Sequence, residues 1–541
     1  MAAPQKTAVL VLLAAPWLLP PQWGPSPTVL PLLLSLACVG LVLLLAPSVP
    51  SRGTVALMAA LAMLGGWSWL AGTMLGEFAA LWIVVCAALA AYRLRHAGWM
   101  HIMADAWLLA ALVSSVIALC QYLGLAGQFA VMSPAALGEA YGQLRQRNQF
   151  ASLANLGLAA LLWRVAQTPS VASGTHGRWH PLAAVLLATA TAATASRTGA
   201  VQLVLVGVLA WSGYRGHAGV RRLYGAALSA YLVATVALPM GLPSDAHAPG
   251  VWSRLAIEQE GCGGRLTLWR NVWQLVRQRP WTGWGWGELD YAHFMTDYEG
   301  PRFCDLLDNA HNLPLHLAVE LGAPAAIVLC LLVGGLLLRV RPWRNTGSNN
   351  ILVWSVLGAI GVHSLLEYPL WYGPFQLTFG LAVGAAWAGS PAASGTSSGQ
   401  RRASYQRRVT DAFACAAVVA ACYAAWDYRR ISQLYLPPAQ RAAAYQEDTL
   451  DKVRDSRLFR AQVAFAEFAL TPLTQDTAPR LYVMGKALLH YSPEARVLEK
   501  LIDSARLSGH LDEADLYLAR YRIVYPTDYT RWSIARQTAP Q

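Results

Sequence analysis

Long runs of apolar residues alternate with short polar stretches along most of this chain. A helix needs roughly 20 apolar residues to cross the hydrocarbon layer of a membrane, with a practical range of about 17–25. By that measure the sequence predicts an all-α polytopic membrane protein with about thirteen transmembrane helices. They are predicted at residues 7–20, 27–46, 54–71, 72–92, 105–124, 149–166, 180–196, 198–213, 222–242, 318–340, 350–367, 372–389 and 409–428.

Lysines and arginines gather in alternate connections between these segments. Cytoplasmic loops carry an excess of positive residues, so the basic connections are expected inside. Seven basic stretches follow this phase, at Lys6, Arg52, Arg93–Arg95, Arg164–Arg178, Arg215–Arg222, Arg339–Arg344 and Arg401–Arg408. The N-terminus is then predicted in the cytoplasm. With thirteen spans, residues 125–148, 243–309 and everything after about 430 are predicted on the outer, periplasmic side.

Composition agrees with a membrane protein. The chain has 541 residues, of which 55% are hydrophobic and only 13% charged, more apolar surface than a soluble core of that size buries. The net charge of +12 does not indicate nucleic-acid binding, because most of the basic residues lie at the ends of apolar segments, where the topology rule explains them. The first apolar stretch lacks a small-residue cleavage site and is followed by further spans, so we expect no cleavable signal peptide.

Two of the eight cysteines differ from the rest. Six lie inside predicted spans, where a lone thiol behaves as a small apolar residue: Cys38, Cys86, Cys120, Cys330, Cys415 and Cys422. Cys262 and Cys304 fall in the long outer loop 243–309, which would be in an oxidising compartment. We therefore expect a disulfide that closes this loop, with two free thiols as the alternative.

The chain after Pro437 and Pro438 changes to an amphipathic helical pattern. We predict a membrane-embedded catalytic domain over 1–430 and a soluble periplasmic helical domain over 431–541. Within the latter, residues 494–526 resemble one tetratricopeptide-type helical hairpin, with Gly509 at the turn. A scaffold role and the docking of an acceptor or partner are both open for this domain.

The most informative polar cluster lies at the end of the long outer loop, in DNAHNLPLHLAVELG at residues 308–322. His311 and Asn312 come just before an apolar helical run, on which His316 and Glu320 are four residues apart and share a face. An imidazole with a pKa of about 6.5 is well suited to take a proton from a hydroxyl near neutral pH. His311 is therefore a candidate general base, although a lone histidine is more often structural.

Arginines are unexpectedly frequent in the outer stretches, where the topology rule does not favour positive charge. Arginine presents a planar fork of donors that matches phosphate oxygens. We therefore interpret these residues as an anion-binding set, with solvation of the loops as the alternative. They are Arg145, Arg147, Arg197, Arg254, Arg265 and Arg270. The sharpest case is Arg197, in a tight turn between two apolar helices.

Two further sequence features concern the same outer edge. Glu367 lies at the outer end of its span, where it could pair with a nearby arginine. Asp305, Asp308 and His311 could be drawn as metal ligands, but no close acidic pair lies in a loop that begins a span, and zinc-type spacing is not present. We expect a reaction without a metal or cofactor.

The order of several motifs carries a resemblance that covers nearly the whole chain. RNQFAS, ASRTGA, GRLTLWRNVWQLVRQRPWTGWGWG, HNLPLHLAVELG and HSLLEYPLWYGPF follow one another along the sequence. In this order they resemble the O-antigen ligase and polymerase superfamily, and more closely the bacterial protein O-oligosaccharyltransferases of the PglL type. The block from Arg265 through Gly322 is its most specific portion.

The resemblance implies a metal-independent transfer of a preassembled oligosaccharide from undecaprenyl pyrophosphate to Ser or Thr hydroxyls of a periplasmic protein such as pilin. It places the enzyme in the bacterial inner membrane, with the active site on the periplasmic face. The family's essential histidine falls on His311, its loop arginine on Arg265, and Arg197 matches the SR turn. Our candidate substrate-binding residues are Arg145, Arg147, Asn148, Gln149, Arg254, Arg270, Asn312, Glu320, Glu367 and Tyr368.

Other activities remain open at the level of the sequence. The sister reactions are ligation of O-antigen to lipid A core and polymerisation of repeat units. A transporter would be expected to carry polar groups near the membrane midplane, whereas the polar groups here crowd the outer edge. The NQF and EYPLWY segments and the soluble C-terminal region favour the protein-acceptor branch by resemblance.

Overall fold

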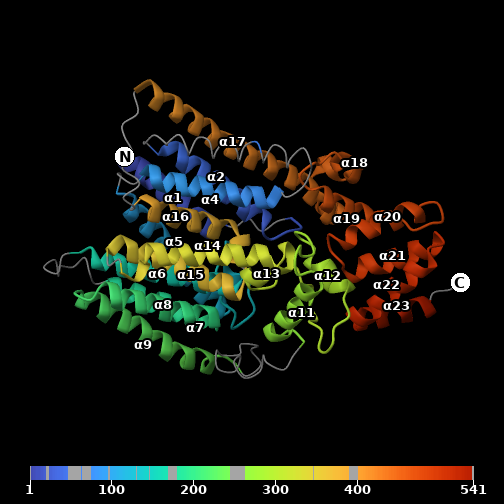
Figure 1. Ribbon diagram of the computed structural model, residues 1–541, viewed down its shortest axis with the longest axis horizontal. Coiled ribbons are helices and arrows are strands. Elements are labelled where there is room, and N and C mark those ends of the chain that lie inside the picture. The colour runs from blue at the N-terminus through green and yellow to red at the C-terminus, as the bar shows by residue number, and fades with distance from the viewer. Residues whose placement is uncertain are drawn as a thin grey trace. The chain divides into compact units, whose positions relative to one another are not determined.

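The computed structural model describes residues 2–19, 24–46, 63, 75–94, 98–129, 131–144, 146–168, 179–243, 262–344, 347–388 and 400–538. Within these residues every regular element is a helix, as Figure 1 shows, so the predicted all-α class is confirmed for the described part of the chain. Apart from Met63, the predicted span 54–71 lies outside the described residues, as do Arg145 and Arg254.

Helices occupy the positions of the other predicted spans. They are α1 (Ala3–Leu18), α2 (Val29–Leu45), α4 (Leu75–Leu94), α5 (Trp99–Tyr122), α6 (Arg147–Ala166), α7 (Trp179–Ala193), α8 (Arg197–Gly213), α9 (Ala218–Met240), α14 (Ala323–Val340), α15 (Ser348–Leu366), α16 (Gly373–Ala388) and α17 (Gln400–Ser432). Among the described residues, 6 helical segments are long and apolar enough to cross a membrane: 76–94, 99–122, 218–240, 323–344, 348–366 and 404–435. The number of spans and their orientation stay predictions.

The remaining helices are shorter. Those between the predicted spans are η1 (Ala126–Gln128), α11 (Arg265–Gln278), α12 (Leu289–Met295), α13 (Leu313–Leu321), η3 (Pro342–Arg344) and η4 (Pro369–Trp371). After α17 follow η6 (Gln433–Tyr435), η7 (Pro438–Gln440), η8 (Ala443–Tyr445), α18 (Thr449–Val453), α19 (Arg460–Leu470), α20 (Ala478–Leu489), α21 (Ala495–Leu507), α22 (Leu511–Val524) and α23 (Pro526–Thr538).

The chain divides into two compact units. The first unit comprises Met1–Ala256 and Val340–Trp426, and the second unit comprises Ile257–Arg339 and Asp427–Gln541. The second unit thus combines the segment from the predicted outer loop with the C-terminal helices. Phe294 of α12 packs in one apolar cluster with residues of α19–α22, which explains this grouping. The functional domains over 1–430 and 431–541 stay predictions.

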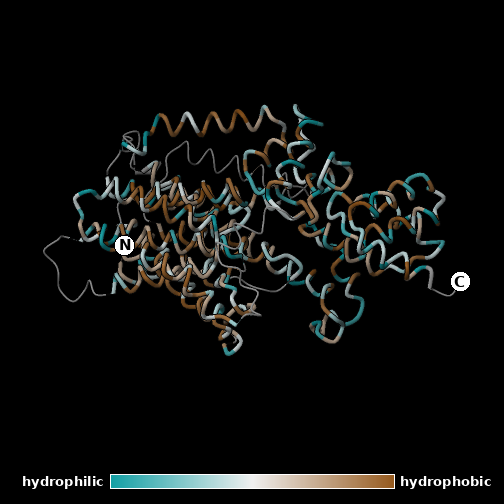
Figure 2. Tube along the Cα trace, turned by 90° about the horizontal axis from the view of Figure 1, so that it is seen from below, coloured by the Kyte–Doolittle hydropathy of each residue, from teal (hydrophilic) through white to brown (hydrophobic). Residues whose placement is uncertain are grey.

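Helix α6 is the central element of the first unit. It contacts α5, α7, α8 and α15, and its residues from Gln149 to Trp163 are all buried. Close approach to α5 depends on Gly157, where an added Cβ would lie 2.3 Å from the Cβ of Ala111. Small residues bring apolar helices together in this way when lipid is the solvent. Figure 2 shows long stretches of apolar residues along the bundle of long helices.

In the second unit, α11 is amphipathic. Its buried residues Leu268, Val272, Leu275 and Val276 pack in one small cluster with residues of α12, of the segment between α12 and α13, and of α13. The C-terminal helices α20, α21, α22 and α23 pack each against the next (Figure 1). Gly509, with φ of +80°, lies at the turn between α21 and α22. Two consecutive helices therefore fill residues 494–526, and their tetratricopeptide character stays a prediction.

Candidate active site

His311 lies in a turn that the neighbouring polar residues shape. Its backbone is left-handed, with φ of +50°, and its N–H donates to Oδ1 of Asn309 at 2.9 Å. Asn312 caps α13, because its Oδ1 accepts from the N–H of Leu315 at 3.0 Å, which satisfies one of the free donors at the helix start. The imidazole of His311 is partly exposed at the start of α13.

The start of α11 lies beside this turn. Arg265 is the first residue of α11 and is partly exposed. One turn further along, Trp269 donates its Nε1–H to the carbonyl of Ala310, the residue before His311, at 3.0 Å. Two of the three predicted catalytic residues, Arg265 and His311, are thus carried by segments that share a direct hydrogen bond.

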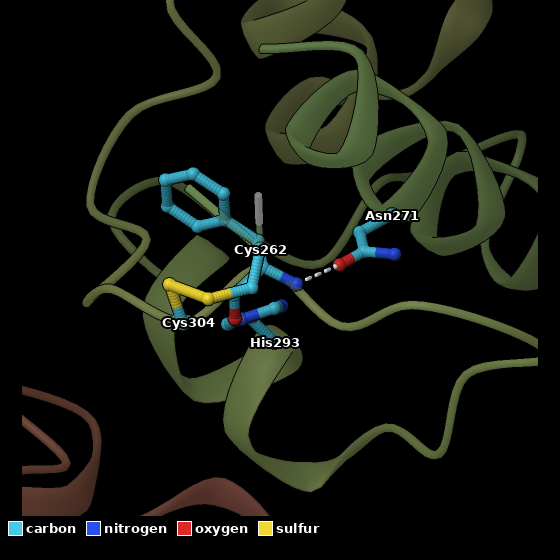
Figure 3. The surroundings of a disulfide bond; sticks show 5 residues. Cys262, Asn271, His293 and Cys304 are labelled. Carbon is cyan, nitrogen blue, oxygen red and sulfur yellow. Dashed lines mark hydrogen bonds between the residues drawn. A yellow bond between two sulfur atoms is a disulfide. The ribbon is translucent and has the colours of Figure 1, made fainter. Parts of the chain in front are cut away.

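A disulfide ties the same segments together. Cys262 and Cys304 are bonded, with their Cα atoms 5.3 Å apart (Figure 3). Beside it, Asn271 of α11 accepts from the N–H of Phe303 at 2.7 Å, and Nε2 of His293 lies 3.1 Å from the carbonyl oxygen of Phe303. The chain before Asp305 is therefore fixed to both α11 and α12.

His316 and Glu320 form a buried pair on α13. Nε2 of His316 lies 3.5 Å from Oε2 of Glu320, and each residue is 2% exposed. The predicted shared helical face is confirmed by this contact. Burial and, as the smaller cause, the nearby His311 together lower the pKa of His316 to about 4, so His316 is neutral at pH 7. Glu320, a predicted substrate-binding residue, lies in the interior of the second unit.

A glycine-rich loop holds the end of α13. The N–H groups of Trp284 and Gly285 donate to the carbonyls of Val319 and Glu320 at 2.8 and 3.0 Å. Gly283 has φ of +68°, and a Cβ there would lie 2.3 Å from the carbonyl oxygen of Glu320. Only glycine fits such a close, left-handed approach. The first glycine of the WTGWGWG sequence, Gly283, is thus required by packing against α13.

The first unit contains a second group of predicted site residues. Nδ2 of Asn148 donates to Oε1 of Glu367 at 3.0 Å, and Oγ of Ser196 donates to Oδ1 of Asn148 at 2.6 Å. Ser196 also caps α8, whose first residue is Arg197, by accepting from the N–H of Gly199. The described contacts of Glu367 thus include the side-chain amides of Asn148 and Gln146, and its pairing with an arginine stays a prediction.

Other predicted residues of this group differ in their surroundings. Arg147 pairs with Glu139 at 2.6 Å, and Gln149 is buried among the helices. Tyr368 stacks on Tyr372 with ring centroids 5.9 Å apart. Arg270, in the second unit, is exposed on α11.

Four polar residues that the sequence analysis did not select lie further along the same helices than the Asn148–Glu367 pair: Ser152, Asn155, Gln202 and His363. Oγ of Ser152 is 2.8 Å from Nδ1 of His363 and accepts from Nε2 of Gln202 at 2.8 Å. Nδ2 of Asn155 donates to the carbonyl of Gly199 at 3.0 Å. A detectable signal was present, because Asn148, Ser152 and Asn155 follow helical spacing within an apolar span.

Three segments of the chain match known protein families. Residues 182–330 match the family described as O-Antigen ligase, and residues 140–165 match the family described as Protein glycosylation ligase. Residues 351–540 match the C-terminal part of the family described as Virulence factor membrane-bound polymerase. The first two matches include the segments of Arg197, Arg265, His311 and Asn148.

Two curated proteins of Acinetobacter baylyi are similar to the chain. A general O-oligosaccharyltransferase is 32% identical over 129 residues, which is 24% of this chain and 22% of that protein. A ComP-specific O-oligosaccharyltransferase is 24% identical over 274 residues, which is 50% of this chain and 48% of that protein. The matches thus span a fifth to a half of these relatives. They confirm the resemblance predicted from the motifs and support a membrane enzyme of the glycosyltransferase type.

Proposed function

We propose that the protein transfers a preassembled oligosaccharide from undecaprenyl pyrophosphate to Ser or Thr hydroxyls of periplasmic proteins such as pilin, without a metal ion. The observation that carries the proposal is the joining of the Arg265 and His311 segments by the Trp269–Ala310 hydrogen bond and the Cys262–Cys304 disulfide. This transfer requires a fixed guanidinium that binds the pyrophosphate, here Arg265, and a partly exposed histidine, here His311.

The reaction exchanges one bond of the anomeric carbon for another and moves one proton. The acceptor oxygen forms a bond to the anomeric carbon of the first sugar, while the bond from that carbon to the phosphate oxygen breaks. The leaving pyrophosphate keeps the electron pair, and the guanidinium of Arg265 stabilises the charge that develops on it. His311 takes the proton of the acceptor hydroxyl, or it orients that hydroxyl while the proton passes to the leaving pyrophosphate.

Arg197 is the corresponding donor in the first unit. It begins α8, where the free backbone N–H groups and the helix dipole also favour an anion. Hydrogen bonds that join Ser196, Asn148 and Glu367 hold the turn before it. We assign Arg197 to binding of the pyrophosphate and the polar residues around it to the frame that orients this arginine.

Two sister reactions are the alternatives, and the family matches support both. The O-Antigen ligase match over 182–330 favours transfer to lipid A core, and the polymerase match over 351–540 favours joining of glycan repeat units. The Protein glycosylation ligase match over 140–165 and the two oligosaccharyltransferase relatives favour a protein acceptor. We therefore place the protein acceptor first.

Reconstitution tests the proposal directly. The purified protein is incubated in liposomes with an undecaprenyl-pyrophosphate oligosaccharide, a chelator, and either a pilin-like protein or lipid A core. Mass spectrometry reads the attachment. Glycan on Ser or Thr of the pilin-like protein is the expected result. Transfer only to lipid A core, or only to a second glycan, would replace the proposed acceptor by that of a sister reaction.

The predicted location has its own test. We propose that the protein resides in the bacterial inner membrane with His311 on the periplasmic side. A periplasm-specific reporter joined after residue 541 should be active, and a cytoplasm-specific reporter at the same place should be inactive. The reverse pattern would refute the orientation.

A further inference from the structure

A polar ladder runs along α6 inside the first unit. Asn148, Ser152 and Asn155 are spaced by four and three residues, so they lie on one face of the helix. Each makes a hydrogen bond to another segment of the first unit, while the rest of α6 is mostly apolar and buried. Polar side chains in such an apolar setting are costly unless they have partners, and they often mark functional positions.

The contacts of Ser152 with His363 and Gln202, here called the middle rung, join three helices through one hydroxyl. Ser152 of α6 contacts Nδ1 of His363 from α15 and the side-chain amide of Gln202 from α8. Gln202 also donates to the carbonyl of Ala359, one turn before His363, at 2.8 Å. All of these side chains are buried. The relative rotation of α6, α8 and α15 is therefore fixed at this level.

The Asn148–Glu367 pair, here called the upper rung, lies one turn nearer the start of α6 and the end of α15. Asn148 is four residues before Ser152 on α6, and Glu367, the C-cap residue that follows α15, is four residues after His363. Four residues correspond to about 6 Å along a helix axis. The contacts Ser152–His363 and Asn148–Glu367 thus repeat the same pairing of α6 with α15 at two heights. One helical turn on each side joins the middle rung to the upper rung.

The upper rung also sets the start of α8. The Oγ of Ser196 donates to Asn148 and accepts from Gly199, so it bonds to the ladder and caps the helix at once. Arg197 follows directly. Ala195, which precedes Ser196, has a left-handed backbone with φ of +50°, so the chain turns sharply here and its backbone has little conformational freedom.

We propose that His363, Ser152 and Gln202 are positioning residues for the lipid-linked donor. They do not react. They hold the Asn148–Glu367 rung and, through Ser196, the turn that carries Arg197 in the orientation that binds the donor pyrophosphate. This inference rests on the proposed function, because it takes Arg197 as a pyrophosphate-binding residue.

Variants of the middle rung test the proposal. We expect Ser152→Ala and His363→Leu each to raise the KM for the undecaprenyl-pyrophosphate oligosaccharide about tenfold, with the KM for the protein acceptor unchanged. His363→Asn should recover most of the donor affinity, since its side-chain amide reaches the position of Nδ1. The double variant Ser152→Ala/His363→Leu should be no worse than either single variant, because both break the same rung.

Ser364→Ala is the matched control. Ser364 is also buried on α15, next to His363, but its hydroxyl donates to the carbonyl of Ile360 within its own helix at 2.9 Å. Its donor KM should stay within twofold of the original. If Ser152→Ala changed the donor KM no more than Ser364→Ala, or if the double variant were additive, the positioning role would be refuted. If His363→Leu did not fold, Ser152→Ala against Ser364→Ala would decide alone.

Direct binding separates this proposal from the proposed function. Radiolabelled undecaprenyl-pyrophosphate oligosaccharide is bound to the full-length protein in liposomes without any acceptor. A tenfold loss of binding in Ser152→Ala supports the positioning role, and unchanged binding contradicts it. Wild-type protein that binds the donor but never glycosylates a protein would refute the acceptor assignment and leave the ladder proposal standing.

Discussion

The polar ladder of the first unit and the turn around His311 in the second unit hold their polar residues by different means. In the ladder, long helices place Asn148 and Ser152 at regular spacing, and contacts between side chains lock the helices together. Around His311 the helices are short, and a disulfide, a tryptophan hydrogen bond and a glycine-rich loop fix the chain.

This difference has a consequence for how each region fails. Deleting one side chain of the ladder leaves the helices in place and changes only their fine alignment. Around His311, few backbone hydrogen bonds belong to regular structure, so each connection supports a larger share of the local fold. We therefore expect the ladder to tune donor binding, and the His311 turn to determine both the chemistry and the local stability.

The largest effect is expected from removing the reacting groups of the second unit. His311→Asn and Arg265→Ala should each lower kcat about 100–1000-fold, because the loss of one preorganised donor or proton acceptor in an active site costs that much. Asparagine tolerates the left-handed backbone of His311, so the turn should persist. Initial rates of glycan transfer in liposomes measure the change.

Arg277→Ala supplies the control for this comparison. Arg277 lies exposed in the last turn of α11, the same helix that Arg265 begins. Its rate should remain within twofold of the original. If folded His311→Asn and Arg265→Ala proteins kept full activity, the second unit would have no part in the chemistry. If only the donor KM rose, the second unit would act in donor binding, as proposed for the ladder.

A middle-sized effect is expected from opening the disulfide. Cys262→Ser/Cys304→Ser removes a link that spans 42 residues, which in the chain-entropy picture amounts to about 4 kcal/mol at most for the local unfolding of that segment. Proteolysis between the two positions should become faster, and transfer should fall about tenfold as the starts of α11 and α13 separate. Limited proteolysis followed by mass spectrometry locates the cuts.

Lone thiols give the matched variant for that experiment. Cys415→Ser and Cys422→Ser change two exposed cysteines of α17 that are not disulfide-bonded. Both should leave proteolysis and transfer unaltered. Equal protection of the 262–304 segment with and without the disulfide would show that hydrogen bonds such as Asn271–Phe303 suffice to hold it.

The smallest effect is expected from the buried pair on α13. Because burial lowers the pKa of His316 to about 4, the folded state binds fewer protons than the unfolded state between that pH and about 6.5. The contribution of neutral His316 to stability is therefore present above pH 6.5 and lost as the pH falls toward 4. His316→Gln should flatten this dependence by about 1 kcal/mol per pH unit.

Thermal unfolding in detergent at a series of pH values checks this expectation. The difference in unfolding midpoint between the wild type and His316→Gln should change by a few degrees between pH 7 and pH 5, in favour of the variant at low pH. A difference that is constant with pH would mean that His316 titrates equally in both states.

Hydropathy located most of the long helices because each crosses a continuous apolar stretch. It placed the start of α5 at residue 105, whereas the helix begins at Trp99. The polar residues His101 and Asp105 lowered the local hydropathy, but both contact Arg164 in the folded chain, at 2.9 and 3.4 Å. Pairing between distant residues cannot be seen in a local average.

The candidate site divides in the same way. His311, Arg265 and Arg197 could be selected from residue type and from the order of motifs, and their catalytic roles stay predictions. Ser152, Gln202 and His363 were missed because single polar residues inside apolar spans look like tolerated exceptions until three helices bring them together. The left-handed turn at His311 and the glycine contacts depend on segments far apart in sequence.

The glycine clamp on α13 also defines how this protein could be recombined with its relatives. Gly322 has φ of +91°, and a Cβ there would lie 2.3 Å from the carbonyl oxygen of Trp281, while Gly283 faces Glu320 equally closely. Ala323 further donates to the carbonyl of Pro280 at 2.8 Å. Residues 280–323 therefore belong to one cassette for chimera design, because a crossover inside it mismatches two interlocking backbones. Only a crossover before Cys262 or after Ala323 also keeps the disulfide and the Trp269–Ala310 hydrogen bond that hold the His311 turn.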